Sequence, residues 1–118
     1  MRILVTGGAG FIGSNFVRLL KRERPDDEVV VIDALTYAGN LDNLDGLSIN
    51  FTQCSIHETL RIVKLMQSFQ IDTVVNFAAE SHVDRSILAP HTALDTNVMG
   101  TACLLEAARQ VPLTRFLH

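Results

Sequence analysis

The sequence predicts an α/β protein with a doubly wound parallel sheet of about five strands and helices on both faces. Three observations predict this class. Short apolar runs alternate with amphipathic stretches along the whole chain, two of the runs are apolar at nearly every position, and a glycine-rich turn joins the first run to the first amphipathic stretch. At 118 residues, 47% of them apolar and 19% charged, the chain has the composition of one globular domain.

Five short runs have the composition of β-strands. They span residues 2–6, 28–33, 50–54, 72–77 and 114–117. Residues 29–32 (Val-Val-Val-Ile) and 74–77 (Val-Val-Asn-Phe) are nearly continuous apolar segments. Strands of a parallel sheet that is covered on both sides have this pattern, so we expect both faces of these strands to be buried.

Three amphipathic stretches lie between the strands, and each predicts a helix with one apolar face. The three faces consist of Ile12, Phe16, Leu19 and Leu20, of Ile62, Leu65, Met66 and Phe69, and of Leu94, Val98, Thr101, Leu105 and Ala108. The third helix is expected from about residue 91 to 110. Small residues recur along it, namely Ala93, Gly100, Ala102, Ala107 and Ala108. Its apolar face either covers the sheet or pairs with another chain, and both interpretations stay open.

The fifth predicted strand is not followed by a helix. Phe116 and Leu117 would then form an apolar patch that a complete doubly wound fold would cover. We therefore expect the chain to be the front part of a longer enzyme, or to need a partner at this edge.

Charge and cysteine content exclude several classes of protein. The net charge of −3 is spread without a basic stripe, which disfavours nucleic acid or an anionic membrane as a partner. No apolar run approaches the roughly 18 residues of a spanning helix, and the first residues lead into a strand rather than a removable signal. Cys54 and Cys103 have no Cys-x-x-Cys partner, so reduced thiols in a cytoplasmic protein are expected.

The segment Gly7-Gly8-Ala9-Gly10-Phe11-Ile12-Gly13 joins the first strand to the first helix. Its glycines fit both G-x-G-x-x-G and G-x-x-G-x-x-G, and they let the backbone approach a pyrophosphate without a clash. The helix N-terminus adds unpaired N–H groups and a partial positive charge. Because the turn has no Lys or Arg, backbone amides must supply most of the neutralisation. The alternative is a glycine-rich turn without a ligand.

Asp33 ends the second predicted strand, about 20 residues after Gly13. A carboxylate there can accept hydrogen bonds from both adenosine-ribose hydroxyls of a dinucleotide, and its charge repels a 2′-phosphate. No Arg or Lys follows it in residues 34–37, so the pattern favours NAD over NADP. Otherwise Asp33 would be a solvated strand end or a cap.

Three segments resemble the extended short-chain dehydrogenase/reductase family, and within it the nucleotide-sugar dehydratases. Residues 5–15 (VTGGAGFIGSN) are typical of the whole superfamily, whereas 33–41 (DALTYAGNL) and 78–86 (AAESHVDRS) are much narrower. The resemblance implies an NAD-binding Rossmann domain over residues 1–118, about the first third of such an enzyme. It also implies a sugar-nucleotide substrate and homodimers of the full-length protein.

The resemblance further implies which residues contact the cofactor. Phe11 and Ile12 would present backbone amides to the pyrophosphate, Ser81 would also lie near the sugar nucleotide, and Asn97 would support the backbone. The expected cofactor-binding residues are Gly7, Gly10, Phe11, Ile12, Gly13, Asp33, Ala34, Leu35, Thr36, Ser55, Ile56, Phe77, Ala78, Ala79, Glu80, Ser81 and Thr96.

Other polar residues support no separate site. Without the resemblance, residues 80–85 could equally be a solvated loop. His82 and Asp84 have no third ligand at a suitable spacing, so no metal site is expected. The remaining histidines, His57, His91 and His118, are scattered and form no cluster in the sequence.

Two departures from the family pattern matter. After the third strand the family usually has Asp-Ile, with the Asp accepting a hydrogen bond from the adenine amine, whereas this chain has Ser55-Ile56. A neutral hydroxyl loses the charge assistance, roughly 1 kcal/mol, so we expect weaker NAD binding than in a typical member. The second departure concerns the family's Tyr-x-x-x-Lys pair and its Thr and Asp-Glu, which are not found in residues 1–118. The single tyrosine, Tyr37, is followed at the fourth position by Leu41.

No catalytic residue is therefore expected in this chain, which would bind a dinucleotide without catalysing by itself. The leading hypothesis is the NAD-binding portion of a nucleotide-sugar dehydratase. The alternatives are a non-catalytic dinucleotide-binding paralogue, an interaction subunit, or a fragment of a related epimerase or decarboxylase.

Overall fold

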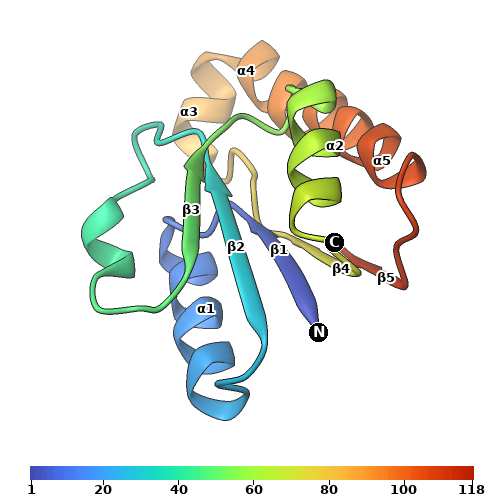
Figure 1. Cartoon of the computed structure of the whole chain (residues 1–118). Coiled ribbons are helices and arrows are strands. Elements are labelled where there is room, and N and C mark those ends of the chain that lie inside the picture. The colour runs from blue at the N-terminus through green and yellow to red at the C-terminus, as the bar shows by residue number, and fades with distance from the viewer.

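The computed structural model describes residues 1–118 and contains one sheet of five parallel strands in the order β3-β2-β1-β4-β5 (Figure 1). The strands are β1 (Arg2–Thr6), β2 (Glu28–Asp33), β3 (Asn50–Gln53), β4 (Thr73–Asn76) and β5 (Arg115–Leu117). The doubly wound parallel sheet is thus confirmed. Only the ends of the last three strands differ from the prediction. The strand order reverses between β1 and β4, which is the position where such sheets open a crevice at their carboxyl edge.

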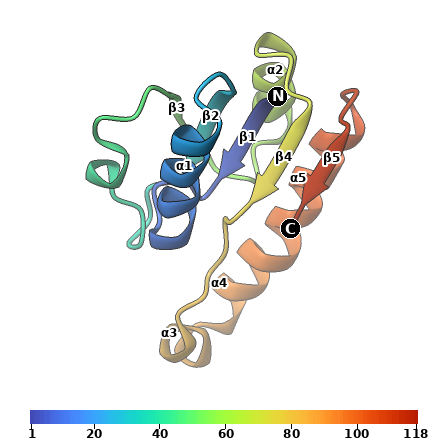
Figure 2. The same ribbon diagram turned by 90° about the horizontal axis from the view of Figure 1, so that it is seen from below.

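Helices cover both faces of the sheet. Helix α1 (Phe11–Glu23) lies on one face, and α2 (Thr59–Ser68) and α5 (Thr101–Arg109) lie side by side on the other (Figure 1). After β4 the chain forms α3 (Val83–Leu88) and α4 (Pro90–Leu94), which project beyond the sheet in Figure 2. None of the helices has the length and apolar character needed to cross a membrane.

Each face of the sheet carries its own apolar core. Toward α2 and α5 the strands contribute Leu4, Val30, Ile32 and Val74. Toward α1 they contribute Ile3, Val5, Val29, Val31 and Val75. Successive strand residues point to opposite faces, so burial on both sides requires apolar residues at every position. The expectation from the continuous apolar runs is confirmed.

The third predicted helix is not one continuous α-helix. Between α4 and α5 lies a π-helical segment, η2 (Asp95–Gly100). A π turn inserts one extra residue into the helix. Leu94, Val98 and Leu105 of the predicted apolar face are exposed, while Gly100, Leu104 and Ala107 are buried, so this face does not cover the sheet, and its pairing with another chain stays a prediction.

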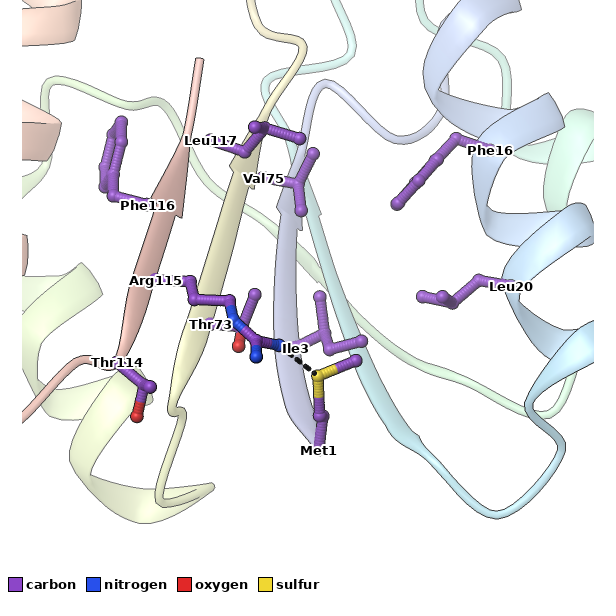
Figure 3. A pocket seen from close by; sticks show the side chains of 10 residues that line it. All are labelled: Met1, Ile3, Phe16, Leu20, Thr73, Val75, Thr114, Arg115, Phe116 and Leu117. Atoms are coloured by element: carbon purple, nitrogen blue, oxygen red, sulfur yellow. Dashed lines mark hydrogen bonds between the residues drawn. The ribbon is translucent and has the colours of Figure 1, made fainter.

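The apolar face expected for the first helix is only partly buried. Val17 is fully buried against the sheet, whereas Ile12 and Leu19 are exposed. Phe16 and Leu20 reach from α1 into an apolar groove of about 530 Å³ beside β4 and β5 (Figure 3). From the helices, only α1 contributes to the lining of this groove.

The two apolar residues of β5 do not form one patch. Phe116 packs against the core under α2 and α5, while Leu117 is 61% exposed on the groove side. Consecutive residues of a strand point to opposite faces, which separates Phe116 from Leu117. Arg115 shares the face of Leu117 and donates a hydrogen bond from Nη1 to Met1 Sδ at 3.3 Å (Figure 3).

Candidate functional site

A cleft of about 670 Å³ opens at the carboxyl ends of the strands. Its walls come from the turn after β1, the segments after β2, β3 and β4, and η2. Doubly wound sheets bind their ligands at this edge, where the strand order reverses. The cleft is therefore the candidate ligand-binding site.

All residues predicted to bind a cofactor line this cleft except Leu35. Leu35 packs into the α1-side core, and its backbone has a left-handed φ of 55°. It shapes the turn after β2 rather than the cleft wall. The cleft is also lined by residues that were not predicted: Ile32, Ala38, Gly39, Cys54, His57 and Asp95.

Two glycines of the turn after β1 are required by the protein itself. A Cβ on Gly13 would lie 2.2 Å from the carbonyl oxygen of Gly7. Gly7 has φ +66°, and a Cβ there would lie 2.6 Å from the backbone nitrogen of Ala78. Backbone cannot move aside as a flexible side chain can, so both positions are restricted to glycine. Gly10 differs, because a Cβ there would meet nothing nearer than 3.4 Å. The missing side chain at Gly10 thus leaves space in the cleft.

The N-terminus of α1 is open to a ligand. Its cap residue is Gly10, which offers no side-chain hydrogen bond, and the first turn contains no acidic residue. The first N–H groups of an α-helix have no partner within the helix. Phe11 and Ile12 line the cleft and are 82% and 67% exposed. Free amides and the helix dipole together suit an anion such as a phosphate.

Asp33 anchors the same turn from the end of β2. Its Oδ2 accepts a hydrogen bond from the Ala9 N–H at 2.9 Å, and its Oδ1 accepts one from the Leu35 N–H at 2.8 Å. The residue is buried, which excludes a merely solvated strand end. Each carboxylate oxygen can accept a further hydrogen bond, so Asp33 can bind hydroxyls in the cleft while holding the turn.

Asn97 fastens the segment after β4 to η2. Its Oδ1 accepts a hydrogen bond from the Glu80 N–H at 2.8 Å, and its Nδ2 donates one to the Glu80 carbonyl at 2.9 Å. The backbone support expected of Asn97 is thus present. Thr96, the preceding residue, lines the cleft, as does Ser81. The segment is not simply a solvated loop, because residues from Val83 onward form α3.

The segment after β2 also contacts α3. The Arg85 guanidinium lies 3.8 Å from the centroid of the Tyr37 ring, and the His82 ring packs edge-on to Tyr37 at 6.4 Å between centroids. A cation over an aromatic face is attracted by the ring electrons. The interaction links two of the segments that line the cleft.

A hydrogen-bonded chain of Ser55, His57 and Asp95 lies at the end of the cleft formed by β3 and η2. Ser55 Oγ is 2.9 Å from His57 Nδ1, and His57 Nε2 is 3.2 Å from Asp95 Oδ2. The expectation that His57 belongs to no cluster is therefore wrong. Asp95 is far from His57 in the sequence and no local spacing connects them, so the fold alone reveals the pair. Gly100 lies close to this turn, because a Cβ there would lie 2.7 Å from Ile56 Cδ1 and 3.2 Å from His57 Cε1.

Other titratable groups near the cleft have structural surroundings. Burial raises the pKa of the Cys54 thiol to about 11, which keeps it protonated and unreactive. His118 also has a partner, since its Nδ1 is 3.0 Å from Asn76 Nδ2 at the ends of β4 and β5. No three His, Cys, Asp or Glu side chains gather to hold a metal ion.

Comparison with known proteins adds independent information. Residues 4–118 match the family described as GDP-mannose 4,6 dehydratase. The chain is 50% identical over 120 residues to the low-salt glycan biosynthesis protein Agl12 of Haloferax volcanii, covering 100% of this chain and 38% of that protein. It is 48% identical over 114 residues to dTDP-glucose 4,6-dehydratase of Salmonella typhimurium, covering 93% and 31%. The chain thus spans about a third of the length of these curated relatives.

Solved structures give the same result. The dTDP-glucose 4,6-dehydratase DesIV from Streptomyces venezuelae, with NAD and TYD bound, superposes with a TM-score of 0.92 at 46% identity, covering 100% of this chain and 38% of that one. UDP-glucose-4-epimerase from Stenotrophomonas maltophila, with NAD and formylated UDP-arabinopyranose, superposes with a TM-score of 0.91 at 32% identity, covering 98% and 35%.

Proposed function

Because the chain belongs to the GDP-mannose 4,6 dehydratase family, we propose that it is the NAD-binding portion of a nucleotide-sugar dehydratase similar to dTDP-glucose 4,6-dehydratase. The observation that carries this proposal is the uncapped N-terminus of α1 in the cleft, next to the open position at Gly10 and the buried carboxylate of Asp33. Such an arrangement suits a pyrophosphate and an adjoining ribose.

The cleft fits an extended dinucleotide. In our proposal the amides of Phe11 and Ile12 bind the pyrophosphate, and Asp33 accepts hydrogen bonds from the adenosine ribose. The turn of Ser55 and Ile56 lies at the adenine. The segment from Phe77 to Ser81, with Thr96, lies at the nicotinamide side. The dinucleotide would thus run from its adenine at β3 to its nicotinamide at β4, along the strand order β3-β2-β1-β4.

The reaction of the whole enzyme is part of the proposal. In a 4,6-dehydratase a hydride leaves C4 of the sugar, water is lost across C5 and C6, and the hydride returns at C6. NAD would supply the hydride acceptor. The residues of this chain would hold the dinucleotide, orient it against the sheet edge and place Ser81 near the sugar nucleotide. Proton transfer requires further segments, since residues 1–118 contain no Tyr-x-x-x-Lys pair.

The identities favour a dehydratase over an epimerase. The chain is 46% identical to DesIV but 32% identical to the Stenotrophomonas epimerase, although the two backbones fit almost equally well. The shared fold explains NAD binding in both, and the difference in sequence bears on the reaction. An epimerase portion remains the second candidate.

A second copy of the chain is the proposed partner of the outer face of α4, η2 and α5. Leu94, Val98, Met99 and Leu105 are exposed there, each by about half or more. Apolar side chains gathered on one face are typical of protein interfaces. Sedimentation of the purified protein tests this, and a strictly monomeric species at micromolar concentration would contradict it. We also propose a cytoplasmic location.

Calorimetric titration of the folded 118-residue chain with NAD tests the main proposal. We expect saturable binding, and weaker binding of NADP because Asp33 repels a 2′-phosphate. Circular dichroism of the same sample establishes that it is folded. A folded sample that takes up no NAD at millimolar concentration would overturn the proposed function.

A further inference from the structure

The hydrogen bonds among Ser55, His57 and Asp95 determine which nitrogen of the His57 ring carries the hydrogen. His57 Nε2 faces two oxygens of Asp95, the backbone carbonyl at 3.1 Å and Oδ2 at 3.2 Å. Both are acceptors, so in the neutral imidazole Nε2 carries the hydrogen and Nδ1 is left as an acceptor. The tautomer of His57 is thus set by η2.

The tautomer in turn determines what Ser55 can do. A serine hydroxyl has one hydrogen and two lone pairs. Its hydrogen must point to His57 Nδ1, 2.9 Å away, because that nitrogen has none to offer. One lone pair accepts the backbone N–H of His57 at 3.3 Å. The other lone pair remains, and Ser55 lines the cleft. Toward a ligand, Ser55 can therefore accept a hydrogen bond but cannot donate one.

We propose that His57 is a positioning residue that makes Ser55 an obligate acceptor and thereby selects a purine with an exocyclic amine over one with a carbonyl at the same position. This inference rests on the proposed function, in which adenine lies at Ser55. Adenine presents N–H donors to the remaining lone pair. Hypoxanthine presents an oxygen, and two acceptors would face each other without a hydrogen between them. The fold uses Asp95, from a distant segment, to set this preference.

The test compares NAD with nicotinamide hypoxanthine dinucleotide by calorimetry at pH 8. We expect the unmodified chain to bind NAD about 10-fold tighter or more, because a site that leaves polar groups unpaired rejects the analogue. In His57→Phe the ring still packs beside Gly100, but both nitrogens are gone and the Ser55 hydroxyl can turn to donate. The ratio of the two dissociation constants should fall to within about threefold. His91→Phe, an exposed position on α4, is the matched control and should keep the original ratio.

Three further variants separate positioning from general damage. In His57→Asn the amide oxygen can take the place of Nδ1, so the ratio should return toward the original value. Ser55→Ala should also lower the ratio, and adding His57→Phe to it should change nothing more, since His57 acts through Ser55. Circular dichroism verifies the fold of each variant.

The outcomes distinguish the two levels of the proposal. If NAD binds but His57→Phe leaves the ratio within twofold of the original, the role of His57 is wrong and the proposed function stands. Additive effects of the Ser55 and His57 substitutions would also overturn the role of His57. If the folded chain binds neither dinucleotide, the proposed function fails, and the inference fails with it.

Discussion

The two ends of the cleft are built by different means. At the turn after β1 the backbone forms the wall of the cleft. Gly7 and Gly13 have no room for a Cβ, the N-terminus of α1 is uncapped, and the turn contains no charged side chain. At the turn after β3 the side chains of Ser55, His57 and Asp95 form a hydrogen-bonded chain. The first end is defined by steric exclusion and the second by the direction of hydrogen bonds.

The difference explains why one end can be read from the sequence and the other cannot. A steric requirement restricts a position to glycine, so a fixed spacing of glycines remains visible in the chain. A hydrogen bond between His57 and Asp95 imposes no spacing, because the fold brings the two segments together. The following experiments test this contrast, beginning with the largest expected effect.

Gly13→Ala should break the first end. The new Cβ would lie 2.2 Å from the Gly7 carbonyl oxygen, so the turn or α1 must shift. We expect the free energy of unfolding, measured by urea denaturation, to fall by about 3 kcal/mol or more. A loss below about 1 kcal/mol would show that the turn adapts and that Gly13 is not sterically required.

Gly10→Ala separates ligand space from fold at the same turn. Its Cβ would meet nothing nearer than 3.4 Å within the protein, so stability should change by no more than about 1 kcal/mol. NAD affinity should nevertheless fall about 30-fold, because the methyl group occupies the space of the pyrophosphate. Calorimetry and urea denaturation on one sample provide both values. Unchanged NAD affinity would place the pyrophosphate elsewhere.

Asp33→Asn tests the carboxylate between the two ends. The carboxylate of Asp33 accepts hydrogen bonds from the N–H groups of Ala9 and Leu35. In the variant, the side-chain NH2 group would face one of these N–H groups, and that hydrogen bond would be lost. We expect NAD affinity to fall about 10-fold, together with a loss of stability of about 1–2 kcal/mol. Calorimetry with NAD measures the first effect. Full retention of affinity would argue against a ribose contact.

Ser55→Asp should strengthen the second end. A carboxylate accepts the adenine amine with charge assistance, worth roughly 1 kcal/mol, so NAD should bind about fivefold tighter. Calorimetric titration of the variant and the unmodified chain gives the ratio. If the affinity is unchanged or lower, this account of the adenine pocket is wrong.

The smallest effect concerns the thiol beside Ser55. Burial raises the pKa of Cys54 to about 11, so at pH 8 the reactive thiolate is scarce. Iodoacetamide should therefore modify the half-buried Cys103 before Cys54, and the difference should vanish in urea. Mass spectrometry of timed samples measures both sites. Rapid native labelling of Cys54 would mean that the second end is more open than the structure indicates.

Much of the fold follows from local patterns. The strands and the glycine turn were predictable because a buried parallel strand needs apolar residues at every position and a tight turn needs glycine. The apolar faces of the helices were less predictable from the sequence. Leu94 and Val98 were expected on one continuous α-helix, but a π turn interrupts it and both side chains are exposed. Ile12 and Leu19 are apolar but exposed, and Ile12 lines the cleft.

The candidate site divides in the same way. Asp33 was predictable from its place at the end of β2, and Asn97 from the resemblance alone. His57 was not, since its role depends on a partner from η2 and on the close approach at Gly100. The contact between Tyr37 and Arg85 likewise joins segments that no motif connects.

The π turn at η2 also limits how the chain tolerates shortening. Deleting one residue from this turn would let a single α-helix run from Pro90 to Arg109. Everything before the deletion would rotate by about 100° around the helix axis relative to Leu104. Asp95 and Asn97 would then swing away from His57 and Glu80, although α5 stayed packed on the sheet. The extra residue of the π turn thus sets the rotation about the helix axis between α5, which packs in the core, and the side chains of η2 that reach the cleft.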